Sequence, residues 1–222
     1  MTSGADRPGL KGRFITFEGI DGCGKTAQVG PLAQRMRSAG LTVLETREPG
    51  GTHIGVGLRA LLLDPANRVL TPQAEVLLYL ADRIQHLQEV IRPALARGEA
   101  VVCDRFHDAT LAYQQHGRGL DLSALEPFLE REVTPRPDLT FWLDVDVATA
   151  RKRLSERRAA GGTAAESRID EDAPDFHQRV REGYQALARL HPERIARIDA
   201  QPGVEAVRNA VWTELTRRFN VG

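Results

Sequence analysis

The chain has 222 residues, 41% of them hydrophobic, and its 30 Lys and Arg residues are balanced by 30 Asp and Glu residues. That length suits one α/β domain with a small mobile appendage. A chain without net charge has no overall field to hold nucleic acid or an anionic membrane. Two cysteines exclude a disulfide framework, and no apolar run approaches the ~20 residues of a membrane span. We therefore expect a cytoplasmic protein.

Short apolar runs alternate with longer amphipathic stretches, after a polar stretch of residues 1–11 that lacks a signal-peptide core and predicts a flexible tail. The predicted strands cover residues 13–18, 41–46, 99–103, 138–143 and 194–198. The predicted helices cover residues 26–39, 54–63, 72–97, 108–114, 122–132, 147–158, 173–190 and 204–219, with Thr71 as the N-cap of the third helix and Gly40 and Gly98 ending two of them.

This alternation predicts an α/β fold with a five-stranded, mostly parallel sheet that helices cover on both faces. We find no internal repeat and no long linker, so residues 12–222 are expected to form a single domain. Residues 159–167 are small, Gly-containing and Thr-containing, and they predict a loop that moves.

One motif carries specific chemistry. The run Gly19-Ile20-Asp21-Gly22-Cys23-Gly24-Lys25-Thr26 fits G-x-x-x-x-G-K-[ST], and it lies between a predicted strand and a predicted helix. Glycines let successive backbone N–H groups turn towards phosphate oxygens, and the following helix adds its positive end. The motif predicts a P-loop fold and nucleoside triphosphate binding, which GTPases, ATPases and kinases share.

Two oxygen-bearing residues predict a Mg²⁺ site beside this loop. Thr26 offers a hydroxyl group, and Asp104 follows the third predicted strand, whose carboxyl end points at the ligand crevice of an open α/β sheet. A solvated strand end, or a local ion pair between Asp104 and Arg105, is the alternative interpretation.

Five stretches in order along the chain resemble thymidylate kinases of the bacterial type: FEGIDGCGKT, TREPGGT, LYLADRIQH, DRFHDATLAYQQHGRG and SRIDEDAPDFHQRVREGY. The resemblance implies a P-loop kinase that transfers the γ-phosphate of ATP to dTMP, giving dTDP for dTTP synthesis. It also implies Mg²⁺, a mobile lid at about residues 153–170 and a homodimer, without nucleic-acid or membrane partners.

On the donor side the resemblance implies that residues 19–26 bind ATP and that Lys25 serves catalysis. Gly22 stands where some relatives carry an arginine aimed at the transferred phosphoryl group, and relatives without it supply that arginine from the lid. Here the matching lid candidates are Arg153, Arg157, Arg158 and Arg168. Arg153 also resembles the residue that stacks on adenine.

On the acceptor side Asp21 matches the acid that contacts the sugar hydroxyl, and Arg59 and Arg105 match contacts to the monophosphate. Two guanidinium groups suit a phosphate dianion because each can donate two parallel hydrogen bonds. Glu48-Pro49 matches a family turn with a cis X-Pro bond.

The thymine contacts are matched by Tyr79, which would stack on the base, and by Arg83, which would donate to its carbonyl edge. Spacing alone favours a core aromatic and a surface charge here, and the resemblance reverses that preference. Tyr113 and Gln114 match positions beside the sugar and base, where a bulky residue blocks a 2′-hydroxyl, and Ala109 stands where relatives carry a serine near the thymine edge.

Three other functions stay open as alternatives. A kinase of dUMP, dCMP or dGMP would share the phosphate site, and Ala109 keeps this alternative alive. A nucleotide-binding switch is disfavoured because this chain lacks the guanine-specifying N-K-x-D signature of many GTPases, and because a switch would not use the lid arginines. A nucleic-acid-dependent ATPase is disfavoured by the neutral charge.

The two cysteines, Cys23 and Cys103, lie at the phosphate site in the sequence. We interpret them as small reduced residues, and a second hypothesis is that oxidation or alkylation of Cys23 blocks ATP.

Overall fold

The computed structural model describes residues 9–160, 168–169 and 173–219. Its sheet has the strand order β2-β3-β1-β4-β5, and every neighbouring pair is parallel. The strands are β1 (Phe14–Glu18), β2 (Val43–Arg47), β3 (Ala100–Asp104), β4 (Leu139–Asp144) and β5 (Ile195–Asp199). The predicted five-stranded parallel sheet is confirmed.

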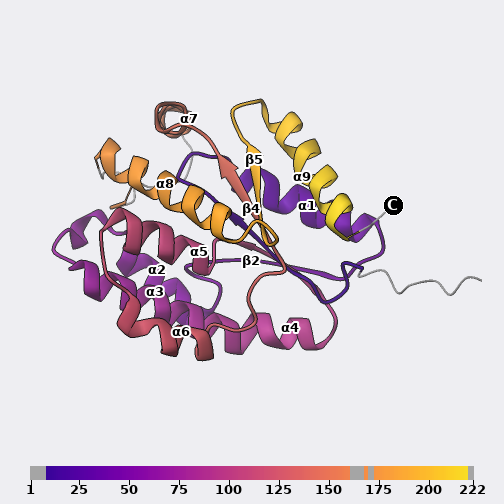
Figure 1. The fold of residues 1–222 in the computed structure, drawn as a ribbon, viewed down its shortest axis with the longest axis horizontal. Helices are drawn as coiled ribbons and strands as arrows, with labels where there is room; N and C mark the ends of the chain where they lie inside the picture. Colours follow the sequence, from indigo (N-terminus) through magenta and orange to yellow (C-terminus); the bar gives the residue numbers. More distant parts are fainter. Residues whose placement is uncertain (1–8, 161–167, 170–172, 220–222) are drawn as a thin grey trace, which may run out of the picture.

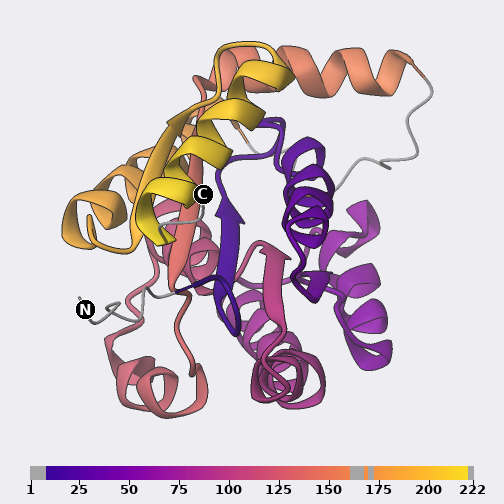
Figure 2. The same ribbon diagram turned by 90° about the vertical axis from the view of Figure 1, so that its right-hand side faces the viewer.

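Helices cover the sheet on both faces (Figures 1 and 2). The helix α1 packs beside α9 on one face, whereas α3, α5 and α8 lie on the other face, and α7 extends from the edge where the strands end. Their bounds are α1 (Thr26–Ser38), α2 (His53–Leu63), α3 (Pro72–His86), α4 (Arg92–Ala96), α5 (His107–Thr110), α6 (Glu126–Glu132), α7 (Val147–Ala159), α8 (Pro174–Leu190) and α9 (Val204–Phe219).

The two faces of β1 explain why this strand lies in the middle. Ile15 and Phe17 pack in the core with α1 and α9, while Phe14 points to the opposite face and packs against Phe106. Because successive side chains of a strand alternate between faces, a strand with helices on both sides must be buried throughout. All five residues of β1 are buried, including Thr16 and Glu18.

Three predicted helices differ in detail from the structure. The predicted helix at 72–97 changes to π geometry at Leu87–Ile91, and the predicted helix at 108–114 is a short α5 followed by a π-helical segment at Leu111–Gly117. In the second segment the N–H group of Arg118 donates to the carbonyl oxygen of Tyr113, five residues back. Three consecutive side chains, Ala112–Gln114, are buried in this segment: Tyr113 packs against Phe176 and Tyr184 of α8, and Gln114 bonds Glu75 of α3. The predicted helix at 122–132 likewise begins with a 3₁₀ turn at Ser123–Leu125.

Local predictions about chain ends and turns can be checked directly. The hydroxyl group of Thr71 accepts a hydrogen bond from the Ala74 N–H group, so the predicted N-cap is confirmed, and Glu48-Pro49 is cis as predicted. Leu10, assigned to the predicted tail, is buried in the core, and residues 1–8 lie outside the described residues. None of the helices in the described ranges combines the length and apolar character needed to cross a bilayer.

Candidate active site

The phosphate loop connects β1 to α1 at the carboxyl end of the sheet. Gly19 and Gly22 have φ angles of 138° and 84°, which L-residues with side chains rarely adopt. A Cβ atom on Gly19 would lie 2.6 Å from the Leu143 carbonyl oxygen, and one on Gly22 would lie 2.3 Å from that of Ala150. The loop therefore packs on the end of β4 and on the first turns of α7, where side chains at these two positions would collide with backbone.

The Lys25 side chain folds back over this loop. Its Nζ atom donates to the carbonyl oxygens of Gly19 and Ile20 at 3.0 and 3.2 Å, and it lies 3.5 Å from the Cys23 Sγ atom. The side chain is buried, so its positive charge lies inside the loop. In a P-loop, backbone N–H groups surround this same space and bind phosphate oxygens.

Both predicted Mg²⁺ residues come together. The Thr26 hydroxyl group donates to Asp104 Oδ2 at 3.4 Å, because β3 pairs with β1 in the sheet. No group of three or more His, Cys, Asp or Glu side chains in the described ranges could hold a metal ion by itself. Mg²⁺ is usually bound through one or two protein oxygens together with substrate phosphates and water, so this pair fits it.

The predicted contacts to the acceptor sugar and phosphate also meet beside the loop. Arg105 Nη2 donates to Asp21 Oδ1 at 2.6 Å and to the Tyr113 hydroxyl group at 3.0 Å, and that hydroxyl group donates to Asp21 Oδ2 at 3.0 Å. Burial alone raises the pKa of Asp21, but Arg105 and Lys25 outweigh it and hold that pKa well below its usual range. Asp21 is therefore ionised near neutral pH, and both of its oxygens act as hydrogen-bond acceptors.

A buried ion-pair cluster surrounds Arg83, one of the residues of the predicted base pocket. Arg83 Nε donates to Glu48 Oε2 at 2.8 Å, and its two terminal nitrogens donate to Thr110 Oγ1 at 2.6 Å and to the Phe106 carbonyl oxygen at 2.8 Å. The His86 Nδ1 atom lies 3.0 Å from Glu48 Oε1. Glu48 thus holds Arg83 and His86, and its carboxylate is occupied by these two partners. Sequence reasoning missed His86, although its position three residues after Arg83 puts both on one helix face.

Positive charge gathers beside the Glu48-Pro49 turn. Arg59 Nη1 donates to the Pro49 carbonyl oxygen at 3.0 Å, and burial, together with the nearby charges of Arg47 and Arg105, lowers the pKa of Arg59. Tyr79 is half-buried at the edge of the core, and burial raises its pKa, so it is a neutral ring. Arg47 was missed by sequence reasoning, and its position at the end of β2 was the available signal.

Gln114 is held by a carboxylate that sequence reasoning also missed. Its Nε2 atom donates to Glu75 Oε1 at 2.8 Å, and Arg168 Nη2 donates to Glu75 Oε2 at 2.5 Å. Burial raises the pKa of Glu75, but Arg118, Gln114 and Arg168 together lower it by more, so this pKa lies below its ordinary value. Arg168 is buried and bound to α3 and to the Leu62 carbonyl oxygen. In this structure it contacts α3 and not the phosphate loop.

The other predicted lid arginines lie on α7. Arg153 donates to the backbone carbonyl oxygens of Ala200 and Gln201 at 2.9 and 3.1 Å, so it lies at the end of β5. Arg157 is exposed and Arg158 is half-buried. The predicted moving loop at 159–167 lies mostly outside the described residues, at 161–167.

The remaining predicted positions, Ala109, Cys23 and Cys103, are packed in or against the hydrophobic core. The Ala109 N–H group donates to Glu18 Oε1 at 3.3 Å, and its methyl group packs on the core. Cys23 and Cys103 are both buried free thiols whose pKa values burial raises, so both are held as thiols and their interpretation as small reduced residues is supported.

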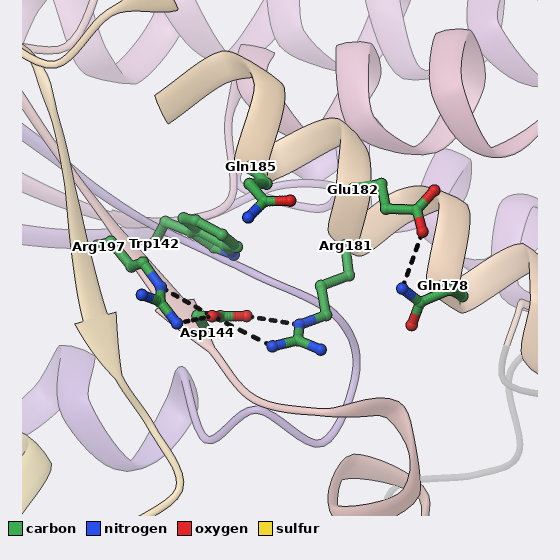
Figure 3. A pocket seen from close by; sticks show the side chains of 7 residues that line it. All are labelled: Trp142, Asp144, Gln178, Arg181, Glu182, Gln185 and Arg197. Atoms are coloured by element: carbon green, nitrogen blue, oxygen red, sulfur yellow. Dashed lines mark hydrogen bonds and ion pairs between the residues drawn. The ribbon is translucent and has the colours of Figure 1, made fainter. Parts of the chain in front are cut away.

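A hollow of about 120 Å³ lies between β4, β5 and α8 (Figure 3). Asp144 on β4 accepts hydrogen bonds there from Arg181 at 2.7 Å and from Arg197 at 2.8 Å. The two arginines converge on that one carboxylate from opposite sides, and none of the predicted site residues lines the hollow.

Comparisons with known proteins point to one family. A family model described as thymidylate kinase matches residues 17–211. The thymidylate kinase of Solidesulfovibrio magneticus is 51% identical over 201 residues, covering 90% of this chain and 96% of the relative, and that of Geobacter sulfurreducens is 48% identical over 210 residues, covering 93% and 98%. The crystal structure of thymidylate kinase from Ehrlichia chaffeensis matches with a TM-score of 0.74 at 32% identity, covering 93% of this chain and 99% of that one.

Proposed function

This chain belongs to the thymidylate kinase family and is therefore a phosphotransferase that uses ATP to convert dTMP to dTDP. On this basis we propose which of its residues bind the two nucleotides and which stabilise the transferred phosphoryl group. The single observation that carries the proposal is the contact of Asp21, Arg105 and Tyr113 beside the phosphate loop. It joins residues assigned to the acceptor directly to the segment assigned to ATP.

On the donor side we assign the ATP phosphates to residues 19–26, with Lys25 as the central point charge. The burial of its ammonium group in the loop supports this role. Arg153 is assigned to adenine, and its contacts at the end of β5 support a place at the outer end of the nucleotide. We assign residues 12–222 to one kinase domain whose lid, at about 153–170, also carries Arg157 and Arg158 as the charges nearest the transferred group.

Mg²⁺ is assigned to Thr26 and Asp104, whose oxygen atoms are adjacent. When bound, Mg²⁺ neutralises charge on the phosphate oxygens of ATP.

On the acceptor side we assign Arg59 and Arg105 to the dTMP phosphate, and Asp21 and Tyr113 to the sugar. Burial, together with the nearby charges of Arg47 and Arg105, lowers the pKa of Arg59, and this concentration of positive charge supports a site for a phosphate dianion. The base is assigned to a pocket built from Glu48, Pro49, Tyr79, Arg83, Ala109 and Gln114. In that pocket Glu48 orients Arg83 and does not itself touch the base, because both of its oxygen atoms already accept hydrogen bonds.

The chemistry asked of these residues is positioning and charge compensation. An oxygen of the dTMP phosphate attacks the γ-phosphorus of ATP in line, the bond from that phosphorus to the β-phosphate oxygen breaks, and ADP leaves. The acceptor phosphate is already anionic near neutral pH, so no side chain has to remove a proton. Lys25, Arg105 and the α7 arginines stabilise the charge on the oxygens around the reacting phosphorus.

We also propose a homodimer formed through α2 and α3, which pack together. Large apolar side chains are exposed there, namely Ile54, Val56, Leu61 and Leu77, and apolar side chains gathered on a surface mark an interaction site.

We place the protein in the cytoplasm, supported by its two free cysteines. The absence of net charge supports a protein without a nucleic-acid partner.

The test is ADP release from ATP with dTMP, dUMP, dCMP, dGMP and the ribose analogue of dTMP supplied separately, with Mg²⁺ and with excess EDTA. We expect strong turnover with dTMP, weaker turnover with dUMP, little with the others and none with EDTA. Tyr113→Phe should keep, and Tyr113→Ala should relax, the discrimination against the ribose analogue. Equal turnover with dCMP or dGMP would remove the assigned roles of Tyr79 and Arg83, and full turnover with EDTA would remove those of Thr26 and Asp104.

A further inference from the structure

The turn that presents Arg105 has an unusual backbone. Within the described ranges, Arg105 is the one residue other than glycine with a positive φ, at 69°. This left-handed conformation is unfavourable for a residue with a Cβ atom, so it persists only where surrounding contacts hold it. Arg105 also carries a proposed role in binding the acceptor phosphate, so what holds the turn bears on the reaction.

Three contacts fix the peptide groups around this turn. The Arg105 N–H group donates to the Phe17 carbonyl oxygen at 2.9 Å, and the Arg105 carbonyl oxygen accepts from the Cys103 thiol at 3.0 Å. The next N–H group, that of Phe106, donates to Glu18 Oε1 at 2.8 Å. The first two contacts join neighbouring strands or the turn itself, whereas Glu18 is a side chain brought to the turn from the end of β1.

The second oxygen of Glu18 reaches the side chain of the same arginine. Glu18 Oε2 accepts a hydrogen bond from the Tyr184 hydroxyl group at 2.7 Å, and Arg105 Nη1 donates to that hydroxyl group at 3.4 Å. The same Nη1 atom donates to the Gly19 carbonyl oxygen at 3.0 Å, and the other terminal nitrogen, Nη2, donates to Asp21 at 2.6 Å. One carboxyl group therefore holds both the backbone after Arg105 and, through Tyr184, its guanidinium group.

Glu18 is also costly to keep. It is fully buried at the end of an apolar strand, and burial, followed by the charge of Asp108, raises its pKa to about 7 against the opposing effects of Arg105, Tyr184 and the Phe106 N–H group. A buried carboxyl group destabilises a fold unless its oxygens are used. The hydrogen bonds to the Glu18 oxygens come from the Phe106 N–H group after the Arg105 turn, from the Ala109 N–H group of α5 and from the Tyr184 hydroxyl group.

We propose that Glu18 is a positioning residue for phosphoryl transfer: it holds the left-handed turn at Arg105 and, through Tyr184, aims the Arg105 guanidinium group at the junction of acceptor and phosphate loop. This inference rests on the proposed role of Arg105. Glu18 is fully buried and bonds Phe106, Ala109 and Tyr184, so it acts through Arg105 and is not itself a catalytic residue.

The test measures initial rates at varied dTMP and ATP for Glu18→Leu, Glu18→Gln and Tyr184→Phe, with the equilibrium affinity for ATP measured separately. We expect Glu18→Leu to lower kcat/KM for dTMP by about 10- to 100-fold, because displacement of a positioned group by a fraction of an ångström is enough for such a loss. The affinity for ATP should stay within about threefold, since the donor loop keeps its own contacts. Glu18→Gln should recover most of the loss, because its amide oxygen can still accept from the Phe106 N–H group.

Two matched variants make the outcome decisive. Thr16→Val removes another buried hydrogen bond of β1, that to Thr140 at 2.8 Å, and should lower the melting temperature without lowering kcat/KM for dTMP. Arg105→Ala tests the proposed role on which the inference rests. If Arg105→Ala loses dTMP turnover and folded Glu18→Leu does not, only the role of Glu18 is wrong. If Arg105→Ala keeps full turnover, the role of Arg105 is wrong as well.

Tyr184→Phe loses a single hydroxyl group and keeps the test open should Glu18→Leu not fold. It should raise KM for dTMP about threefold to tenfold, in line with the loss of one hydrogen bond to a charged group. An unchanged KM in Tyr184→Phe would overturn the link from Glu18 to the guanidinium group. An equal loss of ATP affinity and dTMP turnover in Glu18→Leu would overturn the proposal, since it would indicate general damage to the fold.

Discussion

The donor and acceptor sides of the site are built in different ways. The donor side comes from one contiguous segment, residues 19–26. Lys25 binds groups of that same segment, and Thr26 reaches Asp104 at 3.4 Å, whereas Asp21 of the segment is bound to Arg105 and belongs with the acceptor side. The acceptor side is made of side-chain pairs distant in sequence: 35 residues separate Arg83 from Glu48, and 84 separate Arg105 from Asp21. The acceptor pocket is therefore organised by its own ion pairs before substrate arrives, whereas the donor loop offers a shaped backbone and a charge that nucleotide phosphates complete.

The sharpest way to break this contrast is to remove the buried acceptor-side carboxylate. Glu48→Ala leaves Arg83, which is 2% exposed, without its ionic partner, and should lower the free energy of unfolding by about 3–5 kcal/mol. Urea unfolding followed by circular dichroism measures this change. The matched control is Glu45→Ala on β2, whose ion pair with Arg37 is exposed and should contribute about 0–1 kcal/mol. Equal effects of the two changes would contradict the contrast.

The donor side should respond in the opposite manner, with activity lost and stability kept. Lys25→Met removes the charge inside the phosphate loop and should lower kcat by about 10²- to 10³-fold, the usual effect of deleting one group that stabilises developing charge. Its free energy of unfolding should change by less than about 1 kcal/mol, because the aliphatic part of the side chain is retained. Steady-state rates and urea unfolding on the same preparation check both statements, and a large loss of stability would show that the loop is built as the acceptor side is.

The junction of the two sides should show a pH dependence of stability. Glu18 has a pKa of about 7 in the folded protein, against its ordinary value of 4.5 in the unfolded chain, so the folded state binds the extra proton between these values. Its stabilising contribution is present below about pH 4.5 and is lost as pH rises through about 7. Relative to Glu18→Gln, the wild-type free energy of unfolding should fall by an amount on the order of 2 kcal/mol between about pH 5 and pH 8. Parallel curves for the two proteins would contradict this.

The smallest effect is expected away from both sides, at the hollow beside β5. The Arg197 side chain is 62% exposed, and Asp144 keeps Arg181 as a partner when Arg197 is changed to Ala. Arg197→Ala should leave kcat unchanged and alter the free energy of unfolding by less than about 1 kcal/mol. A clear loss of dTMP turnover would mean that this hollow contributes to the reaction and that the two-sided description is incomplete.

The same contrast separates what sequence reasoning reached from what it missed. The phosphate loop, the five parallel strands and the Thr71 cap are local patterns, in which a few consecutive residues carry the physical cause, and these predictions are confirmed. The π-helical segment at Leu111–Gly117 was missed because its surroundings come from distant parts of the chain: Tyr113 packs against α8, and Gln114 bonds Glu75 on α3. The roles assigned to the site residues stay predictions, which the variants above test.

Three carboxylates show most clearly what the sequence could not give. Glu18, Glu48 and Glu75 are each flanked by ordinary strand, turn or helix residues, and nothing adjacent to them in the sequence names a partner. Their partners are chosen when β3 pairs beside β1, when α3 packs near the turn after β2, and when Arg168 reaches α3. The sequence by itself determined the sheet, the phosphate loop and the family, because short-range backbone and hydrophobic patterns encode them. Tertiary structure alone decided which buried charges meet, since each must find an opposite charge or a donor wherever the folded chain brings one within reach.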